Sequence, residues 1–180
     1  IFYKYLDKCN FYFEYGSGGS TYQAAIRNNI KKIYSVESDY FWHSDLKKII
    51  GDKEYIDFIY CDIDSQPNTW GHPGPKSTID EWKNYSTQIL KLDPNQSKLL
   101  DLILIDGRFR VACCLHCYDL ISDNTYIAFD DFLKRPQYHI VLNYYDIIEK
   151  TSDNNMVILK KKAGNSPPKE IISKFEKIED

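Results

Sequence analysis

The chain has 180 residues, of which 43% are apolar and 27% charged, and its formal net charge at pH 7 is −3. This length and apolar share suffice for one compact core, so we expect a single domain over residues 1–180. The acidic balance disfavours nucleic acid as a partner, because phosphate neutralisation needs clustered Lys and Arg. No apolar run approaches the roughly 20 residues of a membrane span, and no signal peptide opens the sequence. We therefore expect a soluble cytoplasmic protein with no membrane partner.

The first residue of the chain indicates its place in a longer polypeptide, and the cysteines indicate the redox state of its compartment. The chain begins with Ile1 and reaches its first predicted strand almost at once, which indicates a domain cut from a longer polypeptide whose other domains are candidate partners. The five cysteines are odd in number and do not resemble a disulfide framework, as expected in a reducing, intracellular setting. Three of them lie within 113–117 among apolar residues, which favours buried thiols on a core helix over zinc ligands.

Strand-like and helix-like segments alternate along the chain. Strands are expected at 11–15, 32–37, 55–61, 99–105 and 126–129. Helices are expected at 20–29, 39–49, 78–91 and 109–121. A segment at 138–149, a strand at 156–159 and a charged helix after Pro167 and Pro168 follow. This alternation predicts an α/β, Rossmann-like, doubly wound fold with a mostly parallel sheet and helices on both faces.

A glycine-rich turn directly follows the first strand. Gly16, Gly18 and Gly19 would let the backbone approach a ligand closely, and Ser20 or Thr21 can cap the next helix. No Lys-Ser/Thr pair follows the glycines, which argues against a phosphate-binding P-loop. The plain alternative is a capped helix between two strands that end in exposed acids.

An acid also ends the second strand. Glu37 lies 23 residues after Glu14, and an acid in this place can accept hydrogen bonds from both ribose hydroxyls of an adenosine cofactor. The order acid-x-Gly-x-Gly, carried by Glu14, Gly16 and Gly18, resembles motif I of class I S-adenosylmethionine-dependent methyltransferases. Ser20 departs from the usual third glycine.

The resemblance implies a seven-stranded sheet whose last strand is antiparallel, and S-adenosylmethionine as the cofactor. It implies that Glu14 supports the methionine end through water or backbone contacts and that Glu37 binds the ribose. Asp62, after the third strand, would lie near the adenine. The full set of expected cofactor-binding residues is Glu14, Tyr15, Gly16, Ser17, Gly18, Ser20, Thr21, Glu37, Asp62 and Asp106.

Carboxylates follow the fourth and fifth strands at the same edge of the sheet. Asp106, Asp130 and Asp131 would repel one another there, and a hard cation such as Mg²⁺, Mn²⁺ or Ca²⁺ would stabilise them. The arrangement is similar to the metal site of catechol-type and sugar O-methyltransferases. The alternative is that these aspartates only open a turn and cap a segment. Arg108 stands where the sugar enzymes often carry a further acid, so it can instead pair with an aspartate or bind an anionic substrate.

Four residues are candidates for the chemistry: Asp106, Arg108, His72 in the loop after the third strand, and His139 after the fifth. The motif Asp-Gly-Arg-Phe-Arg-Val-Ala-Cys at 106–113 resembles a branch of bacterial and large-virus methyltransferase-like proteins. We therefore expect an O-methyltransferase acting on a sugar, a glycan in glycan biosynthesis, or another small molecule. Two alternatives stay open: an NAD-dependent oxidoreductase, although a Tyr-x-x-x-Lys pair is missing, and a non-catalytic module of the same fold.

Overall fold

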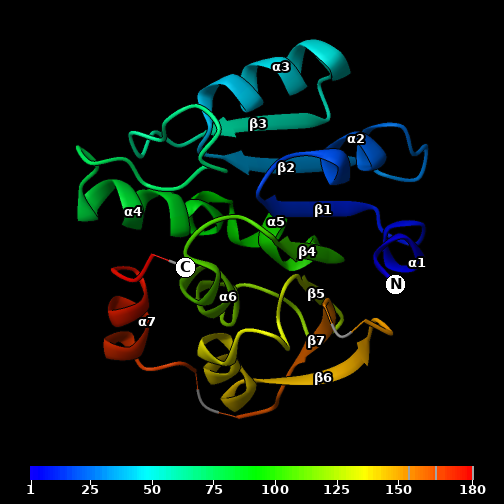
Figure 1. Cartoon of the computed structure of the whole chain (residues 1–180). Coiled ribbons are helices and arrows are strands. Elements are labelled where there is room, and N and C mark those ends of the chain that lie inside the picture. Colours follow the sequence, from blue (N-terminus) through cyan, green and yellow to red (C-terminus); the bar gives the residue numbers. More distant parts are fainter. Residues whose placement is uncertain (154, 165, 180) are drawn as a thin grey trace.

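The computed structural model describes residues 1–153, 155–164 and 166–179, and it contains one seven-stranded sheet (Figure 1). The strands are β1 (Phe11–Tyr15), β2 (Lys32–Glu37), β3 (Ile56–Tyr60), β4 (Leu102–Ile105), β5 (Tyr126–Phe129), β6 (Tyr145–Lys150) and β7 (Val157–Lys161). Their order is β3-β2-β1-β4-β5-β7-β6; β7 runs antiparallel to both of its neighbours, β5 and β6, and the other neighbouring pairs are parallel. The predicted fold class, with its antiparallel last strand, is confirmed.

Helices cover both faces of the sheet (Figure 1). They are α1 (Phe2–Leu6), α2 (Gly19–Ala25), α3 (Tyr40–Ile50), α4 (Ile79–Ser86), α5 (Pro94–Leu99), α6 (Arg110–Cys117) and α7 (Lys169–Phe175), with 3₁₀ turns η1 (Gln88–Lys91) and η2 (Pro136–Asn143). Because strand side chains alternate, Tyr12 packs in one core with Ala24 and Leu46, whereas Phe13 packs in the other with Cys113. Among the described residues, no helix is long and apolar enough to span a membrane.

The cysteine-rich helix is a core element, as its pattern predicts. Cys113, Cys114 and Cys117 of α6 are all buried, and so are Cys9 and Cys61. All five carry free thiols, and burial raises the pKa of Cys117 above its ordinary range. These residues stabilise the fold by packing.

The largest departure from the predicted elements lies before β4. The strand expected at 99–105 begins only at Leu102, because Pro94–Leu99 forms α5. The side chain of Asp93 caps this helix by accepting a hydrogen bond from the backbone N–H of Asn95 at 2.8 Å, and Pro94 fills the first helical position. The helix expected at 78–91 is likewise two pieces, α4 and η1.

Candidate functional site

The glycine turn after β1 lies directly against the end of β4. Gly16 has φ +92° and donates its backbone N–H to the carbonyl oxygen of Val36 at 2.9 Å. A β-carbon on Gly16 would lie 2.7 Å from the nitrogen of Gly107 and 2.8 Å from the carbonyl carbon of Asp106. Only glycine fits both the conformation and the space. We call Gly16, Glu37 and Asp106, at the carboxyl ends of β1, β2 and β4, the rim site.

The side chain of Glu14 stabilises the glycine turn. This side chain is fully buried, and four hydroxyl groups donate to its carboxylate. Tyr12 donates at 2.8 Å, Ser20 at 2.6 Å and Ser35 at 2.7 Å, and Thr21 also donates. Burial raises the pKa of Glu14, and these hydrogen bonds oppose the rise. Glu14 therefore ties β1, β2 and the start of α2 together, and any support that it gives a cofactor acts through the turn.

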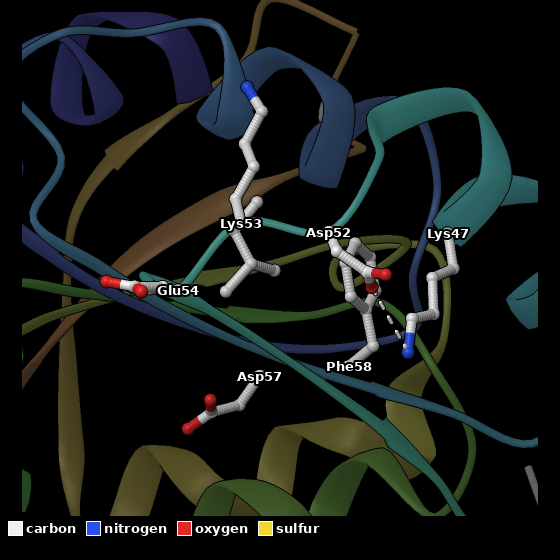
Figure 2. Close-up of a pocket in the computed structure, with 7 residues that line it drawn as sticks. Lys47, Asp52, Lys53, Glu54, Asp57 and Phe58 are labelled. Atoms are coloured by element: carbon white, nitrogen blue, oxygen red, sulfur yellow. Dashed lines mark ion pairs between the residues drawn. The ribbon is translucent and has the colours of Figure 1, made fainter.

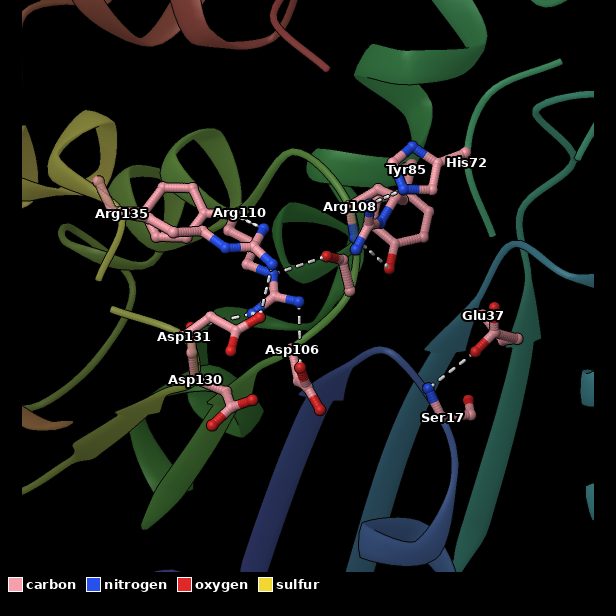
Figure 3. A network of polar contacts seen from close by, with 12 residues as sticks. Ser17, Glu37, His72, Tyr85, Asp106, Arg108, Arg110, Asp130, Asp131 and Arg135 are labelled. Atoms are coloured by element: carbon pink, nitrogen blue, oxygen red, sulfur yellow. Dashed lines mark hydrogen bonds and ion pairs between the residues drawn. The ribbon is translucent and has the colours of Figure 1, made fainter. Parts of the chain in front are cut away.

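Glu37 joins the glycine turn to the start of α3. Its Oε2 accepts from the backbone N–H of Ser17 at 2.9 Å (Figure 3). Its Oε1 accepts from the backbone N–H groups of Ser38 at 2.7 Å and Asp39 at 2.8 Å. Burial raises the pKa of Glu37 to about 7, against the effect of the three N–H groups. A carboxylate has about four lone-pair sites, so Oε2 retains capacity for one further donor such as a ribose hydroxyl.

The loop between β3 and α4 lies on Glu37. Ser38 donates its hydroxyl to the carbonyl oxygen of Gly71 at 3.0 Å, and a β-carbon on Gly71 would lie 3.4 Å from Oε1 of Glu37. Trp42 of α3 donates its indole N–H to the carbonyl oxygen of Ser17 at 2.7 Å. Gly71 thus packs against Glu37, and Trp42 holds the backbone of Ser17, which donates to the same acid.

Two predicted cofactor residues have other contacts in this structure. The hydroxyl of Tyr15 donates to the carbonyl oxygen of Ser86 at 2.8 Å inside the core, so only its backbone lies at the rim. Asp62 accepts from the backbone N–H of Asp64 at 2.9 Å and shapes the loop after β3. Ser17 meets the rim site through its backbone, while its hydroxyl hydrogen-bonds to Ser35.

The three aspartates of the predicted metal site lie around a guanidinium group (Figure 3). Arg110 places Nη2 3.2 Å from Oδ1 of Asp106 and Nη1 3.7 Å from Oδ2 of Asp131, and it donates to the backbone oxygen of Asp130 at 2.9 Å. Arg135 pairs with Asp131 at 2.7 Å. The sequence suggests Arg108 as the partner of an aspartate here, whereas the structure shows Arg110 in this pairing, at the i, i+4 spacing of a helical ion pair from Asp106.

This arrangement does not fit a divalent cation. The described residues contain no group of three His, Cys, Asp or Glu placed to hold a metal ion. The Arg110 side chain is 4% exposed and already supplies positive charge among the carboxylates. The expectation that Asp106, Asp130 and Asp131 bind Mg²⁺ therefore gains no support from the geometry.

Asp106 is the accessible carboxyl of the group, with 43% of its side chain exposed. Partial burial raises its pKa to about 6, Arg110 opposes this, and repulsion from Asp130 and Asp131 adds to it. Burial and repulsion from Asp131 also raise the pKa of Asp130. An accessible carboxyl with a pKa just below neutrality suits proton acceptance.

The two candidate histidines occupy different surroundings. His72 Nε2 lies 2.7 Å from Nη1 of Arg108, which follows Asp106 by two residues. His139 donates from Nε2 to the carbonyl oxygen of Phe132 at 3.2 Å, and its ring packs on that of Phe132. The structure thus brings His72, Arg108 and Asp106 to one end of β4, whereas His139 lies with η2.

Surface hollows occur elsewhere on the molecule. One of about 460 Å³ is lined by α3, β3 and the turn between them, and one of about 500 Å³ adjoins it along α3. Lys47 and Asp52 line both and form an ion pair at 3.5 Å (Figure 2). Neither hollow contains a residue of the rim site.

The fold is shared with solved methyltransferase structures. A methyltransferase-like protein of Silicibacter pomeroyi has a TM-score of 0.80 and 24% identity over 96% of this chain and 90% of that one. A candidate methylase of Haemophilus influenzae has a TM-score of 0.55 at 13% identity, covering 89% and 85%. A candidate caffeoyl-CoA O-methyltransferase of Staphylococcus aureus has a TM-score of 0.53 and 14% sequence identity over 87% of this chain and 78% of that one. No protein-family model and no curated protein matches the sequence. These similarities establish the methyltransferase fold.

Proposed function

We propose that this domain is an S-adenosylmethionine-dependent O-methyltransferase that acts on a hydroxyl of a sugar, a glycan or another small molecule. The observation that carries the proposal is the rim site itself: a glycine turn, a ribose-type acid and an accessible carboxyl at the ends of neighbouring strands. Open α/β sheets bind their ligands outside these strand ends. The methyltransferase fold favours this cofactor over a nicotinamide nucleotide.

The cofactor would bind across the glycine turn. Glu37 would accept a ribose hydroxyl at Oε2, while its bond to Ser17 keeps the turn in place. Glu14 would hold the same turn through its hydroxyl donors. When bound, S-adenosylmethionine supplies an electrophilic methyl group on sulfur.

Asp106 would act as the base. Its carboxylate would take the proton of the acceptor hydroxyl while the hydroxyl oxygen bonds to the methyl carbon; the methyl–sulfur bond would break with its electron pair staying on sulfur, which leaves S-adenosylhomocysteine. A pKa of about 6 leaves Asp106 ionised at pH 7, and Arg110 orients one of its oxygens. No step is assigned to a divalent cation, since Arg110 already lies among the carboxylates.

An exposed tryptophan, the net charge and the free thiols indicate the kind of acceptor and the cellular compartment. Trp70 is 88% exposed beside His72 in the loop after β3 and offers an aromatic face to a sugar ring. The net charge of −3 favours a small-molecule acceptor over nucleic acid. Five free, buried cysteines support a reducing, intracellular setting.

The test is methyl transfer by the purified protein. S-adenosylhomocysteine release is measured with a panel of sugars, sugar acids and diols. Asp106→Asn should lower kcat by about 10²–10⁴-fold at saturating S-adenosylmethionine. Asp123→Asn, at a 91% exposed side chain paired with Lys161, is the matched control. Full activity in Asp106→Asn, or cofactor binding without transfer to any hydroxyl in the panel, would contradict the proposal.

A further inference from the structure

Three side chains far apart in the sequence form a line beside the rim site. Nη1 of Arg108 lies 2.7 Å from Nε2 of His72, and Nδ1 of His72 lies 2.6 Å from Oε1 of Glu179. Figure 3 shows the His72 ring next to Arg108 and Tyr85. The line joins the turn between β4 and α6, the loop between β3 and α4, and the segment after α7.

The donors and acceptors in this line have only one consistent arrangement. A guanidinium group only donates, so Nε2 of His72 accepts from Arg108. The ring proton then lies on Nδ1, which donates to the carboxylate of Glu179. His72 therefore presents an N–H donor, backed by a cation, to an acidic group.

Burial differs sharply along the line. Arg108 is only 7% exposed, whereas the side chains of His72 and Glu179 are 44% and 42% exposed. The cation is built into the fold, but the carboxylate is held at the surface. Because water reaches both His72 and Glu179, their contact contributes little, and a competing carboxylate can displace Glu179.

The line is connected along the chain to both the cofactor acid and the proposed base. Gly71, the residue before His72, lies on Glu37 and Ser38. Arg108 follows Asp106 with only Gly107 between them. Arg108 and His72 thus lie at the same end of β4 as Asp106, whose carboxyl is accessible.

We propose that His72 and Arg108 form a carboxylate subsite for the methyl acceptor, and that Glu179 occupies this subsite when no acceptor is bound. The inference rests on the proposed function and narrows its substrate to a hydroxyl compound that also carries a carboxylate, such as a sugar acid. Glu179 is then an intramolecular competitor of that acceptor.

The experiment uses acetate as the probe and the imidazole ¹⁵N signals of His72 as the readout. Protein labelled at histidine is titrated with acetate at constant ionic strength, and His72→Gln assigns the signal. In Glu179→Ala the His72 signals should shift saturably, at an acetate concentration at least fivefold lower than in the unsubstituted protein. Glu170→Ala, an exposed glutamate on α7, should behave as the unsubstituted protein does.

Three outcomes overturn the inference. These are no saturable shift in Glu179→Ala, equal acetate affinity with and without Glu179, and at least fivefold tighter binding of inorganic phosphate than of acetate, which would assign the subsite to phosphate. S-adenosylhomocysteine binding to the same samples is measured separately by calorimetry. Loss of that binding with the acetate response intact would count against the proposed function alone.

Discussion

Gly16 and Gly107 pass each other in direct backbone contact. A β-carbon on Gly16 would lie 2.7 Å from the nitrogen of Gly107, and one on Gly107 would lie 2.8 Å from the nitrogen of Gly16. The contact joins the glycine turn to the strand end that carries Asp106. The relative position of the cofactor turn and the proposed base is therefore set by two residues without side chains.

Gly107→Ala should destabilise the fold. The added β-carbon would lie 2.0 Å from the hydroxyl oxygen of Tyr85, which is fully buried and cannot move freely. Overpacking of this kind costs about 1–3 kcal/mol, measured by urea unfolding. Gly19→Ala is the control, because no atom lies within 4 Å of its β-carbon position. Equal stability of the two variants would contradict the predicted clash.

Tyr85→Phe should relieve part of that loss. In a double-mutant cycle, the combined variant should be less destabilised than the sum of the single variants by about 0.5 kcal/mol or more. The relief stays partial, because the nitrogen of Gly16 still lies 2.8 Å from the new β-carbon. Strict additivity would mean that the tyrosine hydroxyl is not the obstacle.

Glu14→Gln should weaken both the fold and the cofactor site. The amide cannot accept from all four surrounding hydroxyls, so buried donors lose partners at a cost of about 1–3 kcal/mol. Because Ser20 and Thr21 begin α2, the turn should loosen and S-adenosylhomocysteine affinity should fall. Unfolding and calorimetry measure the two effects. Unchanged stability would show that the buried carboxylate is dispensable.

The titration of Glu37 should make the stability of the fold depend on pH. Burial raises its pKa to about 7 from the ordinary value of 4.5, so the folded protein binds this proton more tightly than the unfolded chain. The stabilisation of the fold by protonated Glu37 is fully present below pH 4.5. It is lost as the pH rises through 7, and the free energy of unfolding falls by on the order of 3 kcal/mol.

The comparison with Glu37→Gln isolates this contribution, because other titrating groups are common to both proteins. The unfolding free energy of the unsubstituted protein minus that of Glu37→Gln should decrease between pH 4.5 and pH 7. Parallel stability curves across this range would mean that Glu37 has an ordinary pKa in the folded state.

Arg110→Met should destabilise the end of β4. The substitution removes the cation between Asp106 and Asp131 and the hydrogen bonds to the backbone oxygens of Gly107 and Asp130. Breaking a buried pair costs about 3 kcal/mol, whereas Lys4→Met, which removes the exposed pair with Glu149, should cost far less. Thermal unfolding compares the stability of the two variants, and an equal loss in Arg110→Met and Lys4→Met would contradict the prediction.

The ion pairs of Arg110 with Asp106 and Asp131 also predict that the protein does not bind Mg²⁺. Mg²⁺ should give no saturable heat with the unsubstituted protein, and a chelator should leave S-adenosylhomocysteine affinity unchanged, because Arg110 holds the place among the carboxylates. Saturable Mg²⁺ binding that is lost in Asp130→Asn would restore the metal site expected from the sequence.

The fold was predictable because its signals are local. Short apolar runs ending in acids, and glycines directly after the first of them, define the alternating elements and the rim of a parallel sheet. Asp93 and Pro94 form a recognisable start for helix α5, but the apolar run at 99–105 favours a strand over its whole length and so hides the end of that helix.

The contacts of the site could not be predicted in the same way. Asp106 and Arg110 are four residues apart, but pairing Arg110 with Asp131 depends on the strand order. Glu179 reaches His72 across 107 residues, and only the packing of the C-terminal segment creates that contact. A sequence shows which charges follow which strand, and the tertiary structure decides which of them meet.

The most direct test of the central claim is calorimetric titration of the protein with S-adenosylhomocysteine, with Glu37→Gln and the exposed Glu54→Gln as variants. We predict micromolar binding to the unsubstituted protein and to Glu54→Gln, and at least tenfold weaker binding to Glu37→Gln. No binding to the unsubstituted protein, or equal binding to all three, would contradict the assignment of Gly16 and Glu37 to a cofactor site.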